Sequence, residues 1–254
     1  LMPLDPRHDQ ILSFLSGRTR GTVADLANHL GVTEVTVRKD LEVLQTQGLL
    51  TRIHGGAVLS GRGQLERRLI AREQEHQDAK RRIAQTAAGL IQSGQRIFLD
   101  ASTTALHLAR LIKDRTDLVV VTNGLFIALE LSYCDGISTL VLGGMLRPRS
   151  NSLVGGLTDD LTRRLRLDLG FFGARGVTPR DGLMEGDREE AHLKHDLVKA
   201  STTVVGIVDS SKFGARFLHA FALPHEIQRL ITDSHAPEAA IVELRGQGIQ
   251  VDLA

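Results

Sequence analysis

The sequence predicts two domains of different fold class. A chain of 254 residues, 42% of them hydrophobic, exceeds one average domain and can bury two cores. Residues 21–58 read as two helices joined by a tight turn and followed by a small hairpin. From Ala79 onward, short apolar runs alternate with helical patterns, as in α/β proteins with a mostly parallel sheet. We therefore expect a small first domain over residues 4–59, a charged linker over 60–78 and an α/β domain over 79–254.

Each helix expected in the first domain begins at a polar residue that can cap it. Asp5 precedes Pro6, and proline is favoured in the first turn of a helix. Thr22 caps the second helix, with Asp25 in place of the Glu of a capping box. Thr33 caps the third helix. The first domain is therefore expected to contain three helices.

Glycines mark the turns of this domain. Gly31 supplies the sharp turn between the second and third helices, and Gly48 closes the third helix. Two short strands, 49–53 and 57–59, then flank His54-Gly-Gly and predict a hairpin. Together these elements are interpreted as a winged helix-turn-helix, with the hairpin as its wing.

One face of the third helix belongs to the core, because Val37, Leu41 and Leu44 recur at helical spacing. The other face is free to enter a DNA major groove, where a recognition helix meets base edges by its N-terminal end. Arginine and lysine donate to guanine or phosphate, and valine or threonine methyl groups contact thymine methyls. The expected DNA contacts are Thr33, Val35, Thr36, Arg38 and Lys39 on the helix and Arg52, His54, Gly55 and Gly56 on the wing.

The charge of the first domain places a limit on how it binds double-stranded operator DNA. Residues 1–60 hold six basic and six acidic side chains, so binding depends on how charge is distributed, not on its total. A single copy is expected to bind weakly, and we expect a homodimer or a larger even assembly whose helices read two half-sites. Arg62, Arg67, Arg68 and Arg72 of the linker either add phosphate contacts or form an ordinary solvated surface, which is the simpler interpretation.

Several classes of site find no support in the composition. A single cysteine, Cys134, excludes an internal disulfide and a cysteine-rich zinc site. His192 and His195 have no carboxylate pattern that completes a metal site. No apolar run has the length of a signal peptide or a membrane span. We expect a cytoplasmic protein that uses no cofactor.

The second domain is expected to place a ligand site beyond its strands. Its strand-like runs are 96–99, 118–121, 139–142, 167–172, 203–208 and 229–232. Polar or glycine-containing segments follow them, and open α/β sheets bind ligands at the carboxyl ends of their strands. The alternative for any single segment is ordinary turn chemistry.

The residue types in these segments suit a small phosphorylated sugar or polyol. Hydroxyls and amide N–H groups that open a helix at Thr104 suit an anion, and Lys212, one of six lysines, suits a phosphate. Asp100 and Asn123 suit sugar hydroxyls. Glu185 and Lys194 either complete the pocket or are surface charges. The expected effector-binding residues are Asp100, Ser102, Thr103, Thr104, Thr122, Asn123, Gly143, Gly144, Glu185, Lys194 and Lys212.

The motifs in both domains resemble those of the DeoR family of bacterial regulators. In the first domain the resemblance rests on Thr33-x-x-Thr-Val-Arg-Lys-Asp-Leu41 and on a wing ending in His-Gly-Gly-Ala. In the second it rests on residues 98–104, 121–123, 142–144, 172–174, Glu190 with Lys194, and 209–214. The resemblance implies a sensor fold similar to ribose-5-phosphate isomerase, a sugar-phosphate effector and repression that the effector relieves. Ser102 departs from the glycine that the family commonly has.

Three alternatives to a ligand-controlled regulator are compatible with parts of this pattern. A sugar-phosphate isomerase-like enzyme is the main one, but the isomerases that the sensor fold resembles carry an acidic pair where this chain has Gly173-Ala-Arg-Gly176. An architectural DNA-binding protein would not need the pocket, and a winged helix used only for protein contacts would not need the groove-facing residues. We therefore predict a repressor of a sugar or polyol catabolic operon that binds ligand without converting it.

Overall fold

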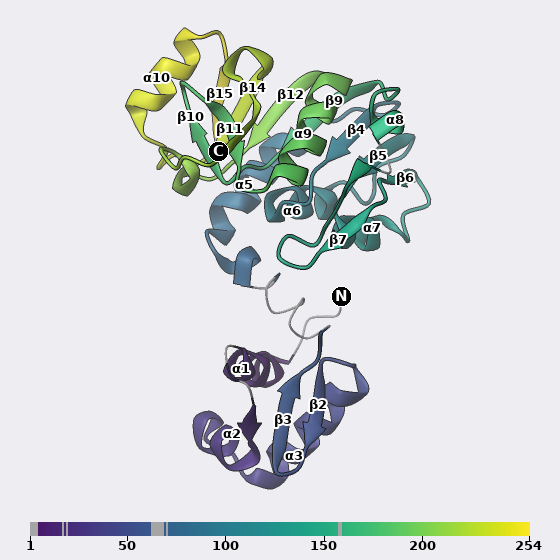
Figure 1. The fold of residues 1–254 in the computed structure, drawn as a ribbon, viewed down its shortest axis with the longest axis vertical. Helices are drawn as coiled ribbons and strands as arrows, with labels where there is room; N and C mark the ends of the chain where they lie inside the picture. Colours follow the sequence, from purple (N-terminus) through teal and green to yellow (C-terminus); the bar gives the residue numbers. More distant parts are fainter. Residues whose placement is uncertain (1–4, 17, 19, 62–68, 70, 157–158) are drawn as a thin grey trace. The chain divides into compact units, whose positions relative to one another are not determined.

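The chain forms two compact units, residues 1–74 and 75–254 (Figure 1). The computed structural model describes residues 5–16, 18, 20–61, 69, 71–156 and 159–254. The elements of the first unit are α1 (Pro6–Leu15), β1 (Gly21–Thr22), α2 (Val23–Leu30), α3 (Glu34–Thr46), β2 (Leu50–Ile53) and β3 (Gly56–Leu59). The predicted order of three helices and a hairpin is therefore confirmed.

The expected caps account for where these helices begin and end. The Asp5 side chain accepts from the Arg7 amide, and Thr33 Oγ1 accepts from the Thr36 amide at 3.2 Å. Gly48, with φ +73°, ends α3 in a Schellman motif, because Leu49 N–H donates to the Leu44 carbonyl.

Two details of the first unit differ from the prediction. Thr22 Oγ1 accepts from the Asp25 amide as expected, but the Asp25 carboxylate accepts from the Thr22 hydroxyl at 2.6 Å, not from its amide. Aspartate is one methylene shorter than the Glu of a capping box, which limits its reach. In addition, β1 joins the hairpin in a sheet of order β1-β3-β2. A strand of two residues is too short to show a period in the sequence.

The second unit is built on a seven-stranded sheet of order β15-β14-β12-β9-β4-β5-β6, in which every neighbouring pair is parallel. The strands are β4 (Arg96–Leu99), β5 (Leu118–Thr122), β6 (Ile137–Val141), β9 (Leu167–Phe172), β12 (Ser201–Ile207), β14 (Arg229–Thr232) and β15 (Gln250–Leu253). Six of them were predicted. β15 was missed because it is an edge strand with only Val251 buried, so it lacks an apolar run.

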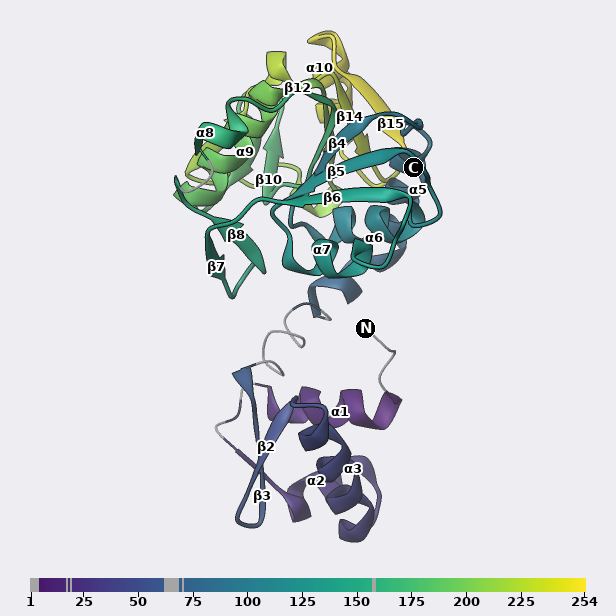
Figure 2. The same ribbon diagram turned by 90° about the vertical axis from the view of Figure 1, so that its right-hand side faces the viewer.

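Helices cover both faces of this sheet (Figures 1 and 2). Helices α5 (Gln77–Ala88), α6 (Thr103–Leu111) and α7 (Leu125–Leu131) lie side by side on one face. The other face packs against α9 (Arg188–Ala200) and α10 (Glu238–Gly246), whose apolar side chains belong to one core cluster. The short helix α8 (Asp159–Thr162) contacts α9. The predicted class, α/β with a mostly parallel sheet, is confirmed.

Two small antiparallel sheets and two short 3-10 helices complete the unit. The sheets are formed by β7 (Met145–Arg147) with β8 (Ser152–Val154), and by β10 (Gly176–Thr178), β11 (Gly182–Glu185) and β13 (His219–Ala222). The 3-10 helices are η2 (Ser210–Lys212) and η3 (Pro224–Glu226). Strands of three or four residues gave no periodic signal in the sequence.

The predicted linker includes the start of α5, because that helix begins at Gln77 and not near Ala79. Residues 71–74 are also helical. Arg62, Arg67 and Arg68, which were considered for phosphate contacts, lie outside the described residues.

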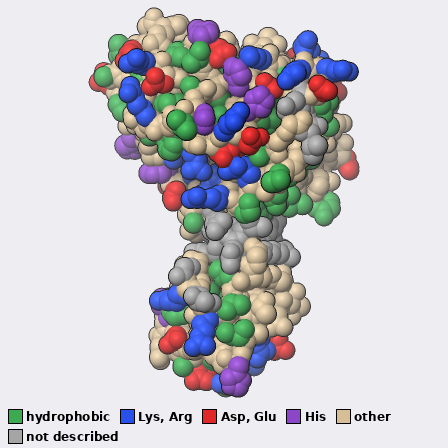
Figure 3. Space-filling view, viewed as in Figure 1, with side chains coloured by type: hydrophobic (Ala, Val, Ile, Leu, Met, Phe, Trp, Pro, Cys, Tyr) green, Lys and Arg blue, Asp and Glu red, His purple; other side chains and the backbone are tan. Residues whose placement is uncertain are grey.

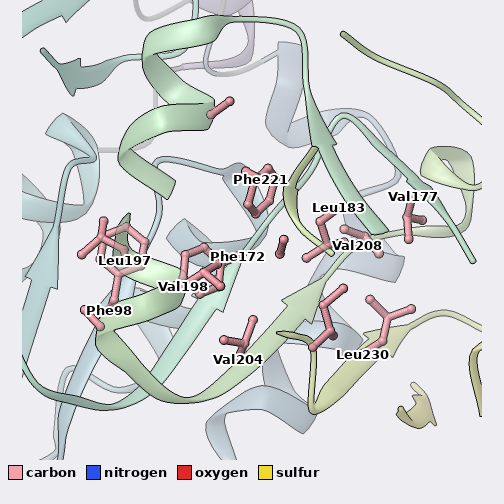
Figure 4. Close-up of a cluster of buried hydrophobic side chains, with 14 of the residues drawn as sticks. Phe98, Phe172, Val177, Leu183, Leu197, Val198, Val204, Val208, Phe221 and Leu230 are labelled. Carbon is pink, nitrogen blue, oxygen red and sulfur yellow. The ribbon is translucent and has the colours of Figure 1, made fainter. Parts of the chain in front are cut away.

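An aromatic core joins the parallel sheet to β13 of the small antiparallel sheet (Figure 4). The ring centroids of Phe98 and Phe172 lie 5.3 Å apart, and those of Phe172 and Phe221 lie 6.1 Å apart. All three rings are fully buried. Phe98 is the last but one residue of β4 and Phe172 the last residue of β9, so this packing lies directly before the two loops that follow.

The order of the strands reverses between β4 and β9. From β4 the chain continues to β5 and β6 on one side, and it returns to β9 on the other. In doubly wound sheets, such a switch point opens a crevice at the carboxyl ends of the strands. The loops after β4 and β9 start at Asp100 and Gly173.

Candidate functional site

Helix α3 exposes the face that was predicted to enter DNA. Val35 is 60% exposed although it is apolar, and Arg38 and Lys39 are exposed. Thr33 is also exposed, whereas Thr36 is half-buried and its hydroxyl lies 2.9 Å from that of Thr33. An exposed valine side chain gains no free energy from its contact with water, whereas packing against a thymine methyl would be favourable.

Two ion pairs organise this helix. Arg38 Nη2 lies 2.5 Å from Glu34 Oε2, one turn away on the exposed side. Asp40 is buried and accepts from Arg7 Nε at 2.7 Å and from Arg7 Nη2 at 2.9 Å, so a fork from α1 holds α3. The hydrogen bonds from Arg7 lower the pKa of Asp40 despite its burial. The sequence analysis missed this pair, although an acidic residue between the core positions Val37 and Leu41 was a signal for it.

The wing divides into exposed and structural residues. Arg52, His54 and Gly55 are exposed, as contact with a DNA backbone would require. Gly56 is buried, and a Cβ there would collide with the carbonyl oxygen of Gly21. The pairing of β1 with β3 therefore excludes a side chain at this position, and a contact of Gly56 with DNA stays a prediction.

A fully buried lysine lies at the switch point of the larger unit. Lys194 Nζ of α9 lies 2.8 Å from Asp100 Oδ2 and donates to Glu185 Oε1 at 2.7 Å and to the Gly173 carbonyl at 2.9 Å. It also lies 4.9 Å from the centre of the Phe221 ring. Burial lowers the pKa of Lys194, but the negative charges of Asp100, Glu185 and Glu190 outweigh burial and leave that pKa raised. The ammonium is therefore charged at neutral pH, and neither Glu185 nor Lys194 is a surface charge.

Asp100 links the loop after β4 to the loop after β9. Its Oδ2 atom accepts from the Gly173 amide at 2.9 Å, and Oδ1 accepts from the Ser102 amide at 3.1 Å. The Ser102 hydroxyl caps α6 by accepting from the Ala105 amide. Thr103 and Thr104 are buried in the first turn, and within the described part of the chain their backbone N–H groups donate no hydrogen bond. These N–H groups are available to an anion at the positive end of α6.

The segments after β5 and β6 show mixed roles. The Thr122 hydroxyl donates to the Leu99 carbonyl at 2.7 Å and accepts from the Gly124 amide at 3.0 Å, so it is committed within the fold. Asn123 is buried, and its Oδ1 atom has no hydrogen-bond partner among the described residues. Gly143 is exposed, whereas a Cβ at Gly144 would collide with the backbone of Val154, so Gly144 serves the β7–β8 hairpin.

Helix α9 contributes a buried carboxylate that the sequence analysis did not assign to the site. Glu190 of α9 is buried, and its Oε1 atom accepts from Ser152 Oγ at 2.6 Å. Arg147 Nε lies 3.7 Å from the same oxygen, and Arg147 Nη2 lies 2.6 Å from Asp187. Burial raises the pKa of Glu190, but Lys194, the serine hydroxyls of the hairpin and Arg147 together lower it. The spacing of Glu190 and Lys194, one helical turn apart, was the available signal.

Lys212 is not brought into this cluster. It follows β12, two strands from β4, and its Nζ atom lies 3.8 Å from Asp209 Oδ2. Its side chain is 30% exposed. Asp209 itself is buried and accepts from the amide of Ser211.

Other kinds of site find no support in the described residues. No group of three or more His, Cys, Asp or Glu side chains there is arranged to hold a metal ion. His195 Nδ1 lies 3.2 Å from the Phe221 carbonyl, and His192 Nε2 lies 4.0 Å from Asp196. In the part of the chain that the structure describes, no helix is long and apolar enough to cross a membrane.

The chain is similar to known regulators over nearly its whole length. The model of the DeoR-like helix-turn-helix domain matches residues 7–62, and that of the DeoR C-terminal sensor domain matches residues 75–234. The chain is 34% identical over 245 residues to the transcriptional regulator YulB of Bacillus subtilis, covering 96% of this chain and 95% of that protein. It is 31% identical over 249 residues to the putative aga operon transcriptional repressor of Escherichia coli, with coverage of 97% and 93%. It is 30% identical over 247 residues to the glycerol-3-phosphate regulon repressor of Escherichia coli, with coverage of 97% and 98%.

Solved structures of lower similarity include ribose 5-phosphate isomerase A of Methanocaldococcus jannaschii, with a TM-score of 0.41 and 19% identity over 54% of each chain. The initiation factor eIF-2B of Pyrococcus horikoshii gives a TM-score of 0.42 and 17% identity over 83% of this chain and 81% of that one. The two family matches and the relatives, which are named as transcriptional regulators and not as enzymes, show that the chain belongs to the DeoR family of helix-turn-helix transcriptional regulators.

Proposed function

We propose that this regulator binds operator DNA by inserting α3 into the major groove and that it represses a sugar or polyol catabolic operon. The observation that carries this proposal is the exposed face of α3, where Val35, Arg38 and Lys39 stand clear of a core formed by Val37, Leu41 and Leu44. The exposed Arg52 and His54 of the wing would add backbone contacts. The relatives that are named as repressors support repression over activation. The family also includes an activator, the L-fucose operon activator of Haemophilus influenzae, which is 32% identical to this chain.

The effector we propose is a phosphorylated sugar or polyol bound at the carboxyl end of the sheet. The phosphate would accept from the Thr103 and Thr104 amides at the start of α6. Asn123 and the carboxylates around Lys194 would accept from the hydroxyls of the carbon chain. Lys212 would approach the phosphate only if its side chain moved away from Asp209, which its partial exposure permits. Effector binding would favour a conformation that releases DNA.

A homodimer or larger even assembly, acting in the cytoplasm, is part of the proposal. Two recognition helices about 34 Å apart would read the two half-sites of an operator. Charge supports the need for two copies, because residues 1–60 have as many acidic as basic side chains. On the larger unit also, Lys and Arg side chains lie beside Asp and Glu side chains (Figure 3). Sedimentation equilibrium with and without DNA would measure the stoichiometry.

The DNA-binding proposal is tested by fluorescence anisotropy with duplexes that tile the region upstream of the gene. We expect Arg38→Ala to weaken binding to the preferred duplex by about tenfold or more at constant salt, with an unchanged circular dichroism spectrum. Arg180→Ala is the matched control, because it removes an exposed arginine from the larger unit. Equal affinities for the wild type and Arg38→Ala would contradict the proposed role of α3.

A further inference from the structure

Buried polar atoms without a hydrogen-bond partner are concentrated near the carboxyl end of the sheet. Among the described residues there are eight such side-chain atoms, and five belong to the loop after β5, the β7–β8 hairpin and β11. These five are Asn123 Oδ1, Arg147 Nε, Asn151 Oδ1, Asn151 Nδ2 and Glu185 Oε2. Buried polar groups are normally paired, so a concentration of unpaired ones calls for an explanation such as a bound ligand.

Asn151, in the turn between β7 and β8, is the most unusual of these residues. It is 3% exposed, yet both polar atoms of its amide lack a partner in the described structure. Its backbone is left-handed, with φ +57°. Two backbone hydrogen bonds hold it there. The backbone N–H of Asn151 donates to the Arg147 carbonyl at 2.8 Å, and its backbone carbonyl accepts from the Leu125 N–H at 3.0 Å. The fold therefore fixes the backbone of this residue in a rare conformation and leaves its side chain without a structural task.

Hydrogen bonds connect the hairpin to the switch point. The Leu153 amide donates to the Asn123 carbonyl at 2.8 Å, and Asn123 Nδ2 donates to the Leu153 carbonyl at 3.3 Å. On the other side, Ser152 Oγ donates to Glu190, which lies one helical turn before Lys194. Asn151 thus lies in a segment that is anchored at one end to the loop after β5 and at the other to the helix that carries the central lysine.

The chemistry of the unpaired atoms identifies the part of a ligand that they suit. Three of the five atoms, Asn123 Oδ1, Asn151 Oδ1 and Glu185 Oε2, are acceptors, and Arg175 Nε is 3.4 Å from the last of them. The other two, Asn151 Nδ2 and Arg147 Nε, are donors. A phosphate monoester at neutral pH offers almost no hydrogen to an acceptor, whereas a hydroxyl both donates and accepts and so suits donors and acceptors alike. The orientation of Asn123 is settled, because its Nδ2 atom donates to a carbonyl, and a flip of the Asn151 amide would leave both of its atoms unpaired.

We propose that Asn151, together with Asn123, forms a hydroxyl-recognition subsite that binds the polyol portion of the effector and determines which sugar is accepted. This inference rests on the proposed sensing of a phosphorylated sugar and extends it to the residues that select the carbon chain. The subsite is separate from the amide groups of Thr103 and Thr104 that would bind the phosphate. Loss of the Asn151 side chain therefore affects sugar selectivity and leaves the phosphate contacts in place.

The test compares binding of inorganic phosphate, glycerol 3-phosphate, ribose 5-phosphate and fructose 6-phosphate to the full chain by isothermal titration calorimetry. The readout is the affinity of the tightest sugar phosphate divided by that of inorganic phosphate. Asn151→Gly keeps the left-handed backbone accessible and removes the amide. We expect this ratio to fall about tenfold or more in Asn151→Gly, as for the loss of hydrogen bonds to a bound ligand, while the affinity for inorganic phosphate stays within about twofold.

Two further variants keep the result interpretable. Asp117→Gly is a matched control, because Asp117 also has φ +57° but is exposed before β5, and we expect its ratio to equal that of the wild type. Asn151→Ala also removes the amide and leaves the backbone less flexible than glycine would, so it serves if the glycine variant does not fold. Its ratio should fall as in Asn151→Gly, because the same side-chain hydrogen bonds are lost.

The outcomes separate the two proposals. If the wild type prefers a sugar phosphate and Asn151→Gly retains that preference, the subsite is refuted, Asn151 is merely hydrated, and the proposed effector class stands. If the wild type binds no sugar phosphate better than inorganic phosphate, both the effector class and the subsite are refuted. A fall in the ratio confined to the two Asn151 variants supports both.

Discussion

Ser102 occupies the space that a side chain at Gly173 would need. A Cβ atom on Gly173 would lie 2.5 Å from Ser102 Cβ and 2.7 Å from Ser102 Oγ. These residues belong to the loops after β4 and β9, which meet where the strand order reverses. The residue that departs from the common family pattern is therefore packed against the backbone of the switch point, and it also caps α6.

We expect Gly173→Ala and Ser102→Gly to show strong energetic coupling. Gly173→Ala should lower the free energy of unfolding by about 1–3 kcal/mol, because the added methyl overpacks against Ser102. Ser102→Gly alone should cost only a few tenths of a kcal/mol, since glycine is an acceptable N-cap. Urea denaturation of both single variants and the double variant measures the coupling. If the loss of unfolding free energy in the double variant equals the sum of the losses in the two single variants, Ser102 is not what excludes a side chain at Gly173.

Lys194→Met should be among the most destabilising substitutions in the larger unit. It would leave Asp100 and Glu185 buried without their cation, and breaking a buried ion pair in this way costs about 3–5 kcal/mol. Because the pKa of Lys194 is raised above its ordinary value of 10.5, the contribution of the wild-type ammonium is fully present below pH 10.5 and is lost only as the pH rises further.

The stability that Lys194→Met loses relative to the wild type should shrink as the pH falls, because a buried carboxylate without its cation can take up a proton. Thermal unfolding between pH 5 and 8 measures this change. Lys199→Met, an exposed position on the same helix, is the control and should lie close to the wild type throughout. A deficit that is constant with pH would argue against the loss of charge compensation.

The Arg7–Asp40 pair should make the first unit sensitive to acid. The pKa of Asp40 is lowered, so its contribution to stability is fully present above its ordinary value of 3.8 and is lost as the pH falls below it through the lowered pKa. Asp40→Asn should cost about 2 kcal/mol at pH 7, the range of a hydrogen bond to a charged group. The deficit should diminish toward pH 3. Methyl NMR signals of Leu41 and Leu44 during a urea titration report on this unit, with Glu42→Gln, an exposed position on α3, as the control.

The fold could largely be predicted because its signals are local. Caps at Asp5, Thr22 and Thr33 and apolar runs in six of the seven parallel strands are visible in the sequence without any knowledge of contacts. The short strands β7, β8, β10, β11 and β13 were missed because they depend on partners elsewhere in the chain and carry no periodic pattern of their own.

The site could be predicted only in part, because burial is decided by tertiary packing. Asp100 and Lys194 were chosen by residue type and strand ends, but only the fold shows that they touch and that Lys212 is held apart from them. The glycines at 56 and 144 were chosen for DNA and ligand contacts, and only the fold shows that backbone packing also requires a glycine at each. Asn151 was missed since a lone asparagine in a polar turn is unremarkable until its burial is known.

We expect the pure protein to show no isomerisation of ribose 5-phosphate. A base in such a reaction must accept a proton from the substrate, but Asp100 and Glu185 both share the ammonium of Lys194. Proton NMR of ribose 5-phosphate over one day, at about 100 µM protein, should show substrate only. Formation of ribulose 5-phosphate that disappears in Lys194→Met would show that this cluster is catalytic, and a ribose-5-phosphate isomerase at the same concentration serves as the positive control.

The ion pair between Glu34 and Arg38 should oppose DNA binding. Arg38 Nη2 is engaged by Glu34 at 2.5 Å, and the Glu34 carboxylate stands at the start of α3, where phosphates would approach. Glu34→Gln should therefore tighten binding about two- to fivefold at low salt, less at high salt, because it removes repulsion and releases the arginine. Anisotropy titrations of Glu34→Gln, Arg38→Ala and the double variant separate these two effects. If Glu34 acts through Arg38, the gain vanishes in the Arg38→Ala background; if it acts only by repulsion, the gain is unchanged there, and weaker binding by Glu34→Gln would contradict both.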